Sequence, residues 1–154
     1  MPLTDILPLA GVMPGLRVST KKMLLEAIAE QASVISQLPA RHIFDSLLQR
    51  ERLGSTGIGN GIAIPHSKFE GLHRLVGLFA QVEKPIDFEA LDGEPVDLVF
   101  VLLAPDGAGA DHLKGLSQIA RVLRGPSITT QLRASRDPDV IHALLTRQTE
   151  AKAA

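Results

Sequence analysis

The chain has 154 residues, 45% of them hydrophobic and 21% charged, with a formal net charge of −1 and no cysteine. These values fit a single globular domain with a buried core, exclude disulfides and thiolate chemistry, and favour a reducing cytoplasm. A near-neutral chain without Trp or Tyr offers nucleic acid neither a basic stripe nor a stacking platform, and its longest apolar run, residues 98–104, is too short to insert into a membrane.

Two helices are predicted after an N-terminal arm. Residues 1–18 mix apolar side chains with prolines and predict an extended arm with a turn of helix. Ser19 or Thr20 can cap the first helix. Its apolar positions keep roughly helical spacing: Met23, Leu24, Ala27, Ile28 and Val34. Pro39 suits the first turn of a second helix that stops at Gly54. The predicted apolar face of that helix consists of Ile43, Phe44, Leu47 and Leu48.

The next segment, residues 54–68, is rich in glycine and then apolar. Glycine adopts positive φ at no steric cost, so this loop can turn its backbone N–H groups toward a bound anion. Residues 62–64 are apolar and predict the end of a buried strand, which Pro65 then stops. His66 would therefore stand at a strand end beside a nest of donors, an arrangement that suits a phosphoryl group.

Nucleotide-binding motifs do not explain this segment. The glycines at 57, 59 and 61 give G-x-G-x-G, whereas the dinucleotide fingerprint is G-x-G-x-x-G and must open a helix. No P-loop motif occurs. The alternative that remains from the residues alone is a tight turn joining a helix to a strand, with an ordinary histidine at its end.

The second half of the chain predicts strands and then helices. Residues 75–82 and 96–104 are apolar and β-branched enough for central strands. Asp111 can cap a helix that ends at Gly125. Its predicted face consists of Leu113, Leu116, Ile119, Ala120 and Leu123. Pro138 opens a last helix before a frayed tail over 147–154. This order predicts one α/β domain over 1–154, a three-layer α/β/α sandwich with a mixed sheet of mainly four or five strands.

The five histidines carry most of the chemical interest. None of them has metal-ligand spacing such as H-E-x-x-H, so no metal site is predicted. His42 and His142 lie in predicted helices and His73 in a charged turn, where surface or packing roles are favoured. For His112, at the start of a helix, the residues alone leave a helix-cap role and a functional role open.

From Arg50 to His66 the sequence resembles the active-site signature of the enzyme IIA proteins of the bacterial phosphotransferase system, mannitol/fructose type, and above all their nitrogen-regulatory branch. Two further blocks, residues 85–100 and 112–123, resemble the family in the same order, so the resemblance covers nearly the whole chain from about Ser19 onward. One departure is Ser67, because the family usually has glycine directly after the active histidine.

The resemblance implies that His66 accepts a phosphoryl group through Nε2, with His112 as a second active-site histidine. Arg50 closes the preceding helix, where its guanidinium can either hold phosphoryl oxygens or simply complement the helix C-terminus. Further candidates for phosphate contacts are Thr56, Gly57 and Ser67. No cofactor or metal is implied.

The implied donor is an HPr-like phosphocarrier that docks on an apolar rim around His66. Candidates for that rim are Ile58, Ile62, Phe69 and Leu72. For Ile62, buried packing is an equally favoured alternative. The absence of an attached permease or HPr-like domain favours a regulator, whose targets would be proteins such as potassium-transport or sensor-kinase proteins. Two alternatives remain: a fructose/mannitol-type IIA component that passes phosphate to a permease, and a binding module that works without phosphorylation.

Overall fold

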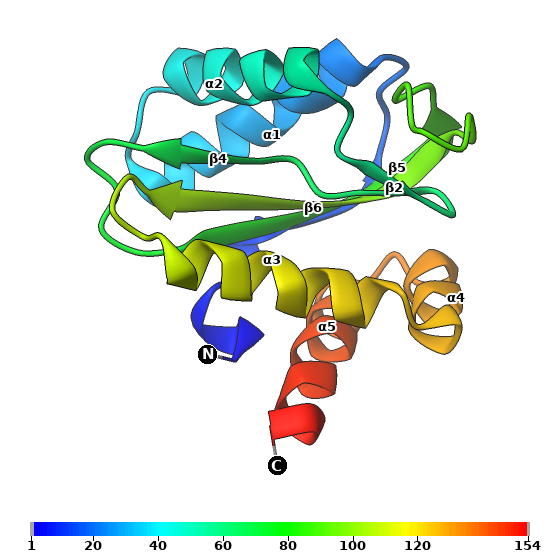
Figure 1. Cartoon of the computed structure of the whole chain (residues 1–154). Helices are drawn as coiled ribbons and strands as arrows, with labels where there is room; N and C mark the ends of the chain where they lie inside the picture. Colours follow the sequence, from blue (N-terminus) through cyan, green and yellow to red (C-terminus); the bar gives the residue numbers. More distant parts are fainter. Residues whose placement is uncertain (1, 154) are drawn as a thin grey trace.

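The computed structural model describes the backbone of residues 2–153 and the side chains of residues 2–147. A mixed six-stranded sheet in the order β1-β5-β6-β3-β2, with β4 also paired to β6, forms the middle layer. Helices α1 and α2 cover one face of the sheet, and α3, α4 and α5 cover the other (Figure 1). The predicted three-layer α/β/α sandwich is confirmed, with six strands instead of the expected four or five.

The N-terminal segment is part of the sheet and the core. Two short 3₁₀ turns, η1 (Leu3–Asp5) and η2 (Leu9–Gly11), lead into β1 (Val12–Leu16), which pairs with β5 in parallel. Leu3, Ile6 and Leu7 are buried against the α3–α5 side. The predicted extended arm therefore includes an edge strand, a position in the sheet where Pro14 is tolerated.

Helices α1 (Lys21–Ser36) and α2 (Ala40–Leu53) begin and end close to the predicted positions. The Thr20 hydroxyl accepts a hydrogen bond from the Met23 N–H at 3.1 Å, which confirms the predicted cap. Pro39 is the N-cap of α2 rather than its first helical residue. Of the predicted apolar positions, Leu24 and Ile28 are buried, whereas Met23 and Val34 are exposed. The buried face of α1 consists of Leu24, Leu25, Ile28, Ala29 and Ala32.

The glycine-rich run forms a β-hairpin rather than an open loop. Strands β2 (Gly57–Gly59) and β3 (Ile62–Ala63) are antiparallel. Asn60 and Gly61 have φ values of 58° and 79°, the positive values that a two-residue hairpin turn of type I′ requires.

Pro65 interrupts the strand without ending it, contrary to the prediction. The Pro65 carbonyl accepts from the Leu102 N–H at 3.0 Å, so the chain stays beside β6 and continues as β4 (His66–Phe69), parallel to β6. A proline lacks the N–H but keeps its carbonyl as an acceptor, and one acceptor is enough here. His66 is thus the first residue of a strand rather than the residue after one.

Strands β5 (Val76–Ile86) and β6 (Val96–Pro105) are the predicted central strands, and the structure pairs them antiparallel. Successive side chains point to opposite faces, so the two strands supply both halves of the core. Phe79 and Phe100 pack toward α3–α5, while Leu78 and Val101 pack toward α1 and α2.

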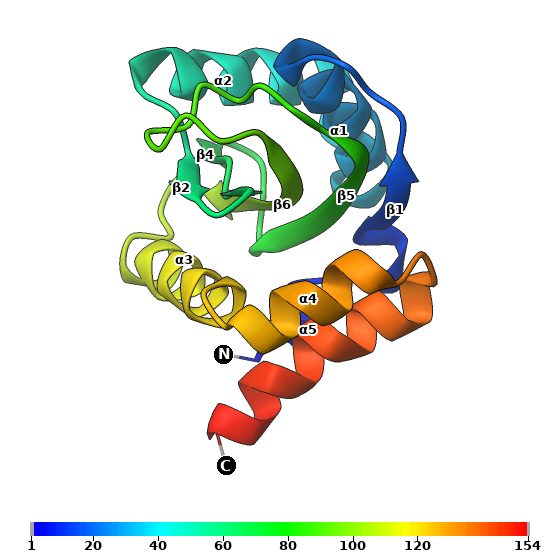
Figure 2. The ribbon, with the colours of Figure 1, turned by 90° about the vertical axis from the view of Figure 1, so that its right-hand side faces the viewer.

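The C-terminal part contains α3 (Ala110–Leu123), α4 (Pro126–Ala134) and α5 (Pro138–Ala153), which Figure 2 shows along one side of the sheet. Gly109, not Asp111, is the N-cap of α3. Leu113 is exposed although it was predicted on the inner face, because His112 and Gly115 occupy that face. The separate helix α4 was not predicted. Ala154 lies outside the described residues, as do the side chains from 148 onward, so the frayed tail stays a prediction.

None of the helices in the described part of the chain is both long enough and apolar enough to cross a membrane.

Candidate phosphoryl-transfer site

The fold brings His66 and His112 together. His66 opens β4 and faces the side of the sheet that α3 covers, and His112 lies in the first turn of α3. Their ring centroids are 5.6 Å apart with an angle of 62° between the ring planes. Gly115, one turn after His112, allows this approach, since a Cβ there would lie 3.2 Å from a methyl group of Leu102. The predicted pairing of the two histidines is confirmed.

A backbone carbonyl fixes the tautomer of His66. The Nδ1 atom lies 2.8 Å from the Ile64 carbonyl oxygen. A carbonyl oxygen only accepts, so Nδ1 carries the proton and Nε2 keeps its lone pair. Burial lowers the pKa of His66 below its usual value, and the positive charge of Arg50 lowers it too, against the opposing effects of the Ile64 hydrogen bond and of Glu51. The ring is therefore neutral at pH 7, with Nε2 as a nucleophilic nitrogen.

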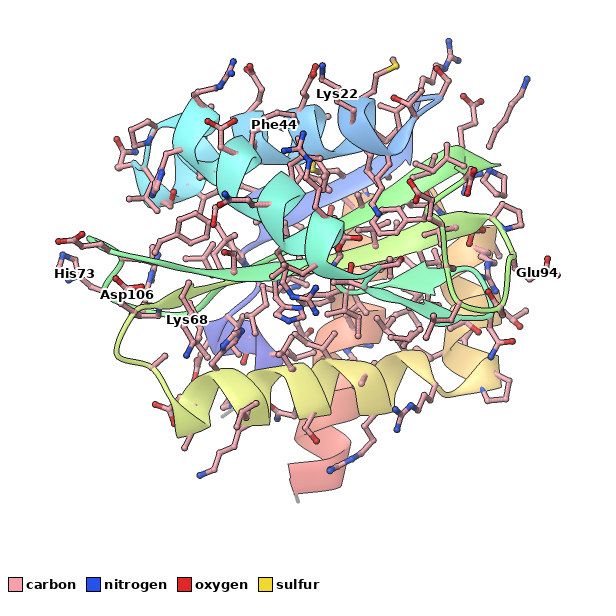
Figure 3. The ribbon with its side chains drawn as sticks, turned by 45° about the horizontal axis from the view of Figure 1, so that its top comes forward. Lys22, Phe44, Lys68, His73, Glu94 and Asp106 are labelled. Carbon is pink, nitrogen blue, oxygen red and sulfur yellow. The ribbon has the colours of Figure 1, made fainter. Side chains whose placement is uncertain are left out.

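His112 has a buried ring nitrogen without a partner. Only 7% of the residue is exposed, and its Nε2 atom makes no hydrogen bond among the described residues. Burial lowers the pKa of His112, as do the charges of His66 and Lys68. Lys68 follows His66 by two residues on β4 and lies on the α3 side of that strand (Figure 3). A buried polar atom left unpaired is costly, and it often marks a functional site.

Arg50 stands at the entrance of the hairpin. It belongs to the last turn of α2, and its Nη1 atom donates to the Gly54 carbonyl at 2.9 Å. The side chain is half-buried, and its charge acts on His66. The structure thus places a guanidinium within electrostatic reach of His66.

The N–H groups at the start of the hairpin are already used. The Thr56 N–H donates to Glu51 Oε1 at 3.2 Å, and the Thr56 hydroxyl donates to Glu51 Oε2. The Gly57 N–H donates to the Ser55 hydroxyl at 3.1 Å. Phosphate binding by Thr56 and Gly57 stays a prediction, and it would require these donors to leave their present partners.

Ser67 lies on the other side of β4 from His66. Its hydroxyl oxygen is 2.5 Å from that of Ser46 on α2, whereas His66 contacts α3. The serine at the position of the family's usual glycine is therefore accommodated by a hydroxyl pair under α2. A phosphate contact by Ser67 stays a prediction, which its side chain in this orientation does not support.

The three other histidines have the packing and surface roles that were expected. His42 packs edge-on against Phe69 with ring centroids 5.5 Å apart. His142 Nε2 lies 2.8 Å from the Leu7 carbonyl and ties α5 to the N-terminal segment. His73 is exposed at one end of the sheet, the end where Asp106 also lies (Figure 3). Among the described residues, no group of three His, Asp or Glu side chains could hold a metal ion.

The apolar rim differs from the predicted one. Ile62, Phe69 and Leu72 are buried in the core, because they face the helices on either side of the sheet. Of the predicted set, only Ile58 is exposed. Exposed apolar side chains on the elements around the site also include Leu53 at the end of α2 (86% exposed), Leu91 in the β5–β6 loop (94%) and Leu113 beside His112 (69%).

Sequence reasoning missed a buried ion pair next to the site. Lys21 Nζ lies 2.8 Å from Glu51 Oε1, and the two side chains are 15% and 2% exposed. A signal was present, since Glu51 falls in the last turn of a helix and Lys21 in the first turn of another. Each charge is at the helix end that the helix dipole disfavours.

Comparisons with known proteins identify the family of this chain. The model of the family described as "Phosphoenolpyruvate-dependent sugar phosphotransferase system, EIIA 2" matches residues 6–148. A nitrogen regulatory protein of Bradyrhizobium diazoefficiens is 51% identical over 145 residues, covering 94% of this chain and 95% of the relative. The nitrogen regulatory protein of Escherichia coli is 45% identical over 128 residues, covering 82% of this chain and 78% of the relative.

Solved structures extend the likeness to the fold. The crystal structure of nitrogen regulatory protein IIA-Ntr from Neisseria meningitidis has a TM-score of 0.89 and 37% identity, covering 94% of this chain and 99% of that one. IIA mannitol from Escherichia coli, at 21% identity, shares the fold with a TM-score of 0.75, over 90% of this chain and 97% of that one. The chain therefore belongs to the EIIA type 2 family of the phosphoenolpyruvate-dependent sugar phosphotransferase system, in its nitrogen-regulatory branch.

Proposed function

We propose that this protein accepts a phosphoryl group on Nε2 of His66 from an HPr-like phosphocarrier and signals through its phosphorylation state. Proteins of the EIIA family are phosphotransfer carriers, which take phosphate from phosphocarriers and pass it on. The observation that carries the proposal is the hydrogen bond of 2.8 Å between His66 Nδ1 and the Ile64 carbonyl, because it leaves Nε2 free beside His112.

The transfer exchanges one P–N bond for another. The Nε2 lone pair forms the new bond to phosphorus, while the electron pair of the donor's P–N bond stays with the donor histidine ring. The donor ring leaves as a neutral imidazole, because its other nitrogen carries a proton as Nδ1 of His66 does. The Nδ1 proton of His66 remains on its nitrogen, held by the Ile64 carbonyl. No base has to remove a proton, so the step depends mainly on alignment and on stabilising the charge of the transferred group.

Arg50 and His112 supply that stabilisation in the proposal. The Arg50 guanidinium can exchange the Gly54 carbonyl for phosphoryl oxygens, which bind a guanidinium more strongly because they are charged. The unpartnered Nε2 of His112 can donate to a phosphoryl oxygen when that nitrogen carries the ring proton. A phosphoryl group on His66 would thus give His112 the partner that it lacks.

The signalling part follows from the nitrogen regulatory relatives. Phosphorylation would add about −1.5 to −2 charge to the surface near Leu113 and Ile58 and change its affinity for a regulatory target in the cytoplasm, such as a potassium-transport or sensor-kinase protein. A sugar-transport role is the second candidate, because a fructose-specific EIIABC component of Bacillus subtilis is 31% identical over 142 residues. In that role the phosphoryl group would pass to a permease subunit.

The test is incubation with an HPr-like donor and its phosphoenolpyruvate-dependent kinase, followed by intact mass. The wild type should gain one phosphoryl group that is acid-labile and base-stable, and folded His66→Ala should gain none. Uptake by His66→Ala would mean that another atom is the acceptor. Onward transfer to a sugar permease domain, with identical partner proteins bound in both phosphorylation states, would favour transport over regulation.

A further inference from the structure

A buried ion pair couples the two helices on one side of the sheet. Lys21 is the first residue of α1 and Glu51 lies in the last turn of α2, with 2.8 Å between Nζ and Oε1. The Lys21 ammonium also lies 4.5 Å from the centre of the Phe88 ring and donates to the Phe88 carbonyl at 3.3 Å. Both charges are therefore fully engaged within the protein.

Stability alone does not account for this pair. A buried ion pair costs so much desolvation that apolar replacements are often equally stable. The helix dipoles add to the cost, because Lys21 is a cation at a helix N-terminus and Glu51 an anion at a helix C-terminus. The pair is thus an expensive feature, placed directly beside the candidate site.

Hydrogen bonds lead from the ion pair to the nucleophile. Glu51 accepts from both the N–H and the hydroxyl of Thr56. The Thr56 carbonyl accepts from the Ile64 N–H at 3.0 Å. The Ile64 carbonyl in turn accepts from His66 Nδ1 at 2.8 Å. Each contact fixes the group that makes the next one, so the position of the Ile64 carbonyl depends on Glu51.

We infer that the Lys21–Glu51 pair is a positioning device for His66, which acts through Thr56 and Ile64 to hold the imidazole in the Nδ1–H tautomer with Nε2 free. The inference rests on the proposed role of His66 as acceptor. Lys21, Glu51 and Thr56 are positioning residues in this scheme, since none of them needs to touch the phosphoryl group.

Protonation of His66 and positioning by Glu51 can be told apart. The charged groups that act on the pKa of His66 are Arg50 and Glu51 from α2, and α3 places His112 against the ring. Because Glu51 raises that pKa, removing its charge would not make His66 more protonated. Protonation of the ring therefore cannot explain a slower transfer in a Glu51 variant, and the tautomer of the ring reports positioning separately from the rate.

The test reads the tautomer of His66 directly, from the ¹⁵N chemical shifts of its ring in the folded protein without a donor. The wild type should show the Nδ1–H form. Glu51→Gln should show a mixture with the Nε2–H form, together with phosphoryl acceptance about 10- to 100-fold slower, the usual loss when a supporting partner is removed. Thr56→Val, which removes only the hydroxyl, should change both quantities in the same direction by less.

Asp97→Asn is the matched control. It weakens a partly exposed ion pair that also reaches the hairpin, where Arg133 binds Asp97 at 2.9 Å and the Asn60 carbonyl at 2.7 Å. The control should lose stability but keep the Nδ1–H tautomer and the transfer rate.

An unchanged tautomer in folded Glu51→Gln overturns the inference, and if that variant does not fold, an unchanged tautomer in Thr56→Val does so. A shift in the Asp97→Asn control as large as in Glu51→Gln also overturns it. A tautomer shift in Glu51→Gln when even the wild type takes up no phosphoryl group supports the positioning role and refutes the proposed function instead.

Discussion

Replacing His112 with phenylalanine should stabilise the protein and at the same time impair it. The phenyl ring introduced by His112→Phe would keep a planar group between α3 and the sheet but remove the buried Nε2 atom that has no partner. An unsatisfied buried polar group costs about 1–3 kcal/mol. The free energy of unfolding should therefore rise by up to that amount, and Tm by about 2–4 °C for each kcal/mol in a chain of this size.

The difference in the free energy of unfolding between His112→Phe and the wild type should increase as the pH falls. The folded-state pKa of His112 is lowered, mainly by burial, so the folded protein binds fewer protons than the unfolded chain. The wild type thus loses stability as the pH falls from about 6.5 through the folded-state pKa, and the variant lacks this contribution. His66 titrates in both proteins, so the difference between them isolates His112.

Urea unfolding between pH 5 and 8 measures the stability, and single-turnover transfer from a phosphorylated HPr-like donor measures the function. Transfer should slow by about 10²–10³-fold, the loss expected for one positioned donor. His42→Phe, at the ring that packs on Phe69, is the control and should transfer normally. If His112→Phe is less stable than the wild type and its transfer is also slowed by about 10²–10³-fold, the histidine is a packing residue. If transfer is unchanged, His112 does not belong to the site.

Three further predictions follow from the same geometry. Phosphoryl acceptance should persist below pH 6.5, because burial and Arg50 lower the pKa of His66; a pH–rate profile that loses half its rate above pH 6.5 would contradict this. Arg50→Ala should slow transfer by about 10²–10³-fold. Arg50→Lys should recover only part of the rate, because the point charge of an ammonium cannot replace the bidentate guanidinium. Arg52→Ala, at an exposed neighbour, is the control and should not change the rate; an equal loss in both alanine variants would indicate general destabilisation. Ser67→Gly should lower the free energy of unfolding by about 1–2 kcal/mol, because it removes the hydrogen bond to Ser46 and makes the unfolded chain more flexible. The transfer rate should not change, and slower transfer would show that Ser67 takes part in the site.

Features that depend on local sequence were predictable. The cap at Thr20, the end of α2 at Gly54 and the central strands β5 and β6 follow from capping preference and apolar runs. The pairing of His66 with His112 followed from the resemblance in three ordered blocks, and not from either residue alone.

Features that depend on distant partners were not predictable. The strand β1 is five residues long and contains Pro14 and Gly15, so only its neighbour β5 makes it a strand. Helix α4, nine residues long, begins directly after a stop signal. For Lys21 and Glu51 the sequence signals only that each charge stands at the helix end that the dipole disfavours. A pattern within one helix cannot show that the partner lies in another.

The bond between His66 Nδ1 and the Ile64 carbonyl has a consequence for energetics. On the proposed mechanism the proton stays in place while phosphorus moves from one imidazole to another, so reactants and products contain the same kinds of bond. The equilibrium constant of such an exchange is close to one, so the reaction runs in both directions. The phosphorylated fraction of this protein would then follow the ratio of phosphorylated to unphosphorylated donor. It would fall as quickly as it rises when that ratio changes. A histidine held in this way therefore reports the current phosphorylation state of the donor. A phosphoserine ester would instead persist until a phosphatase hydrolysed it.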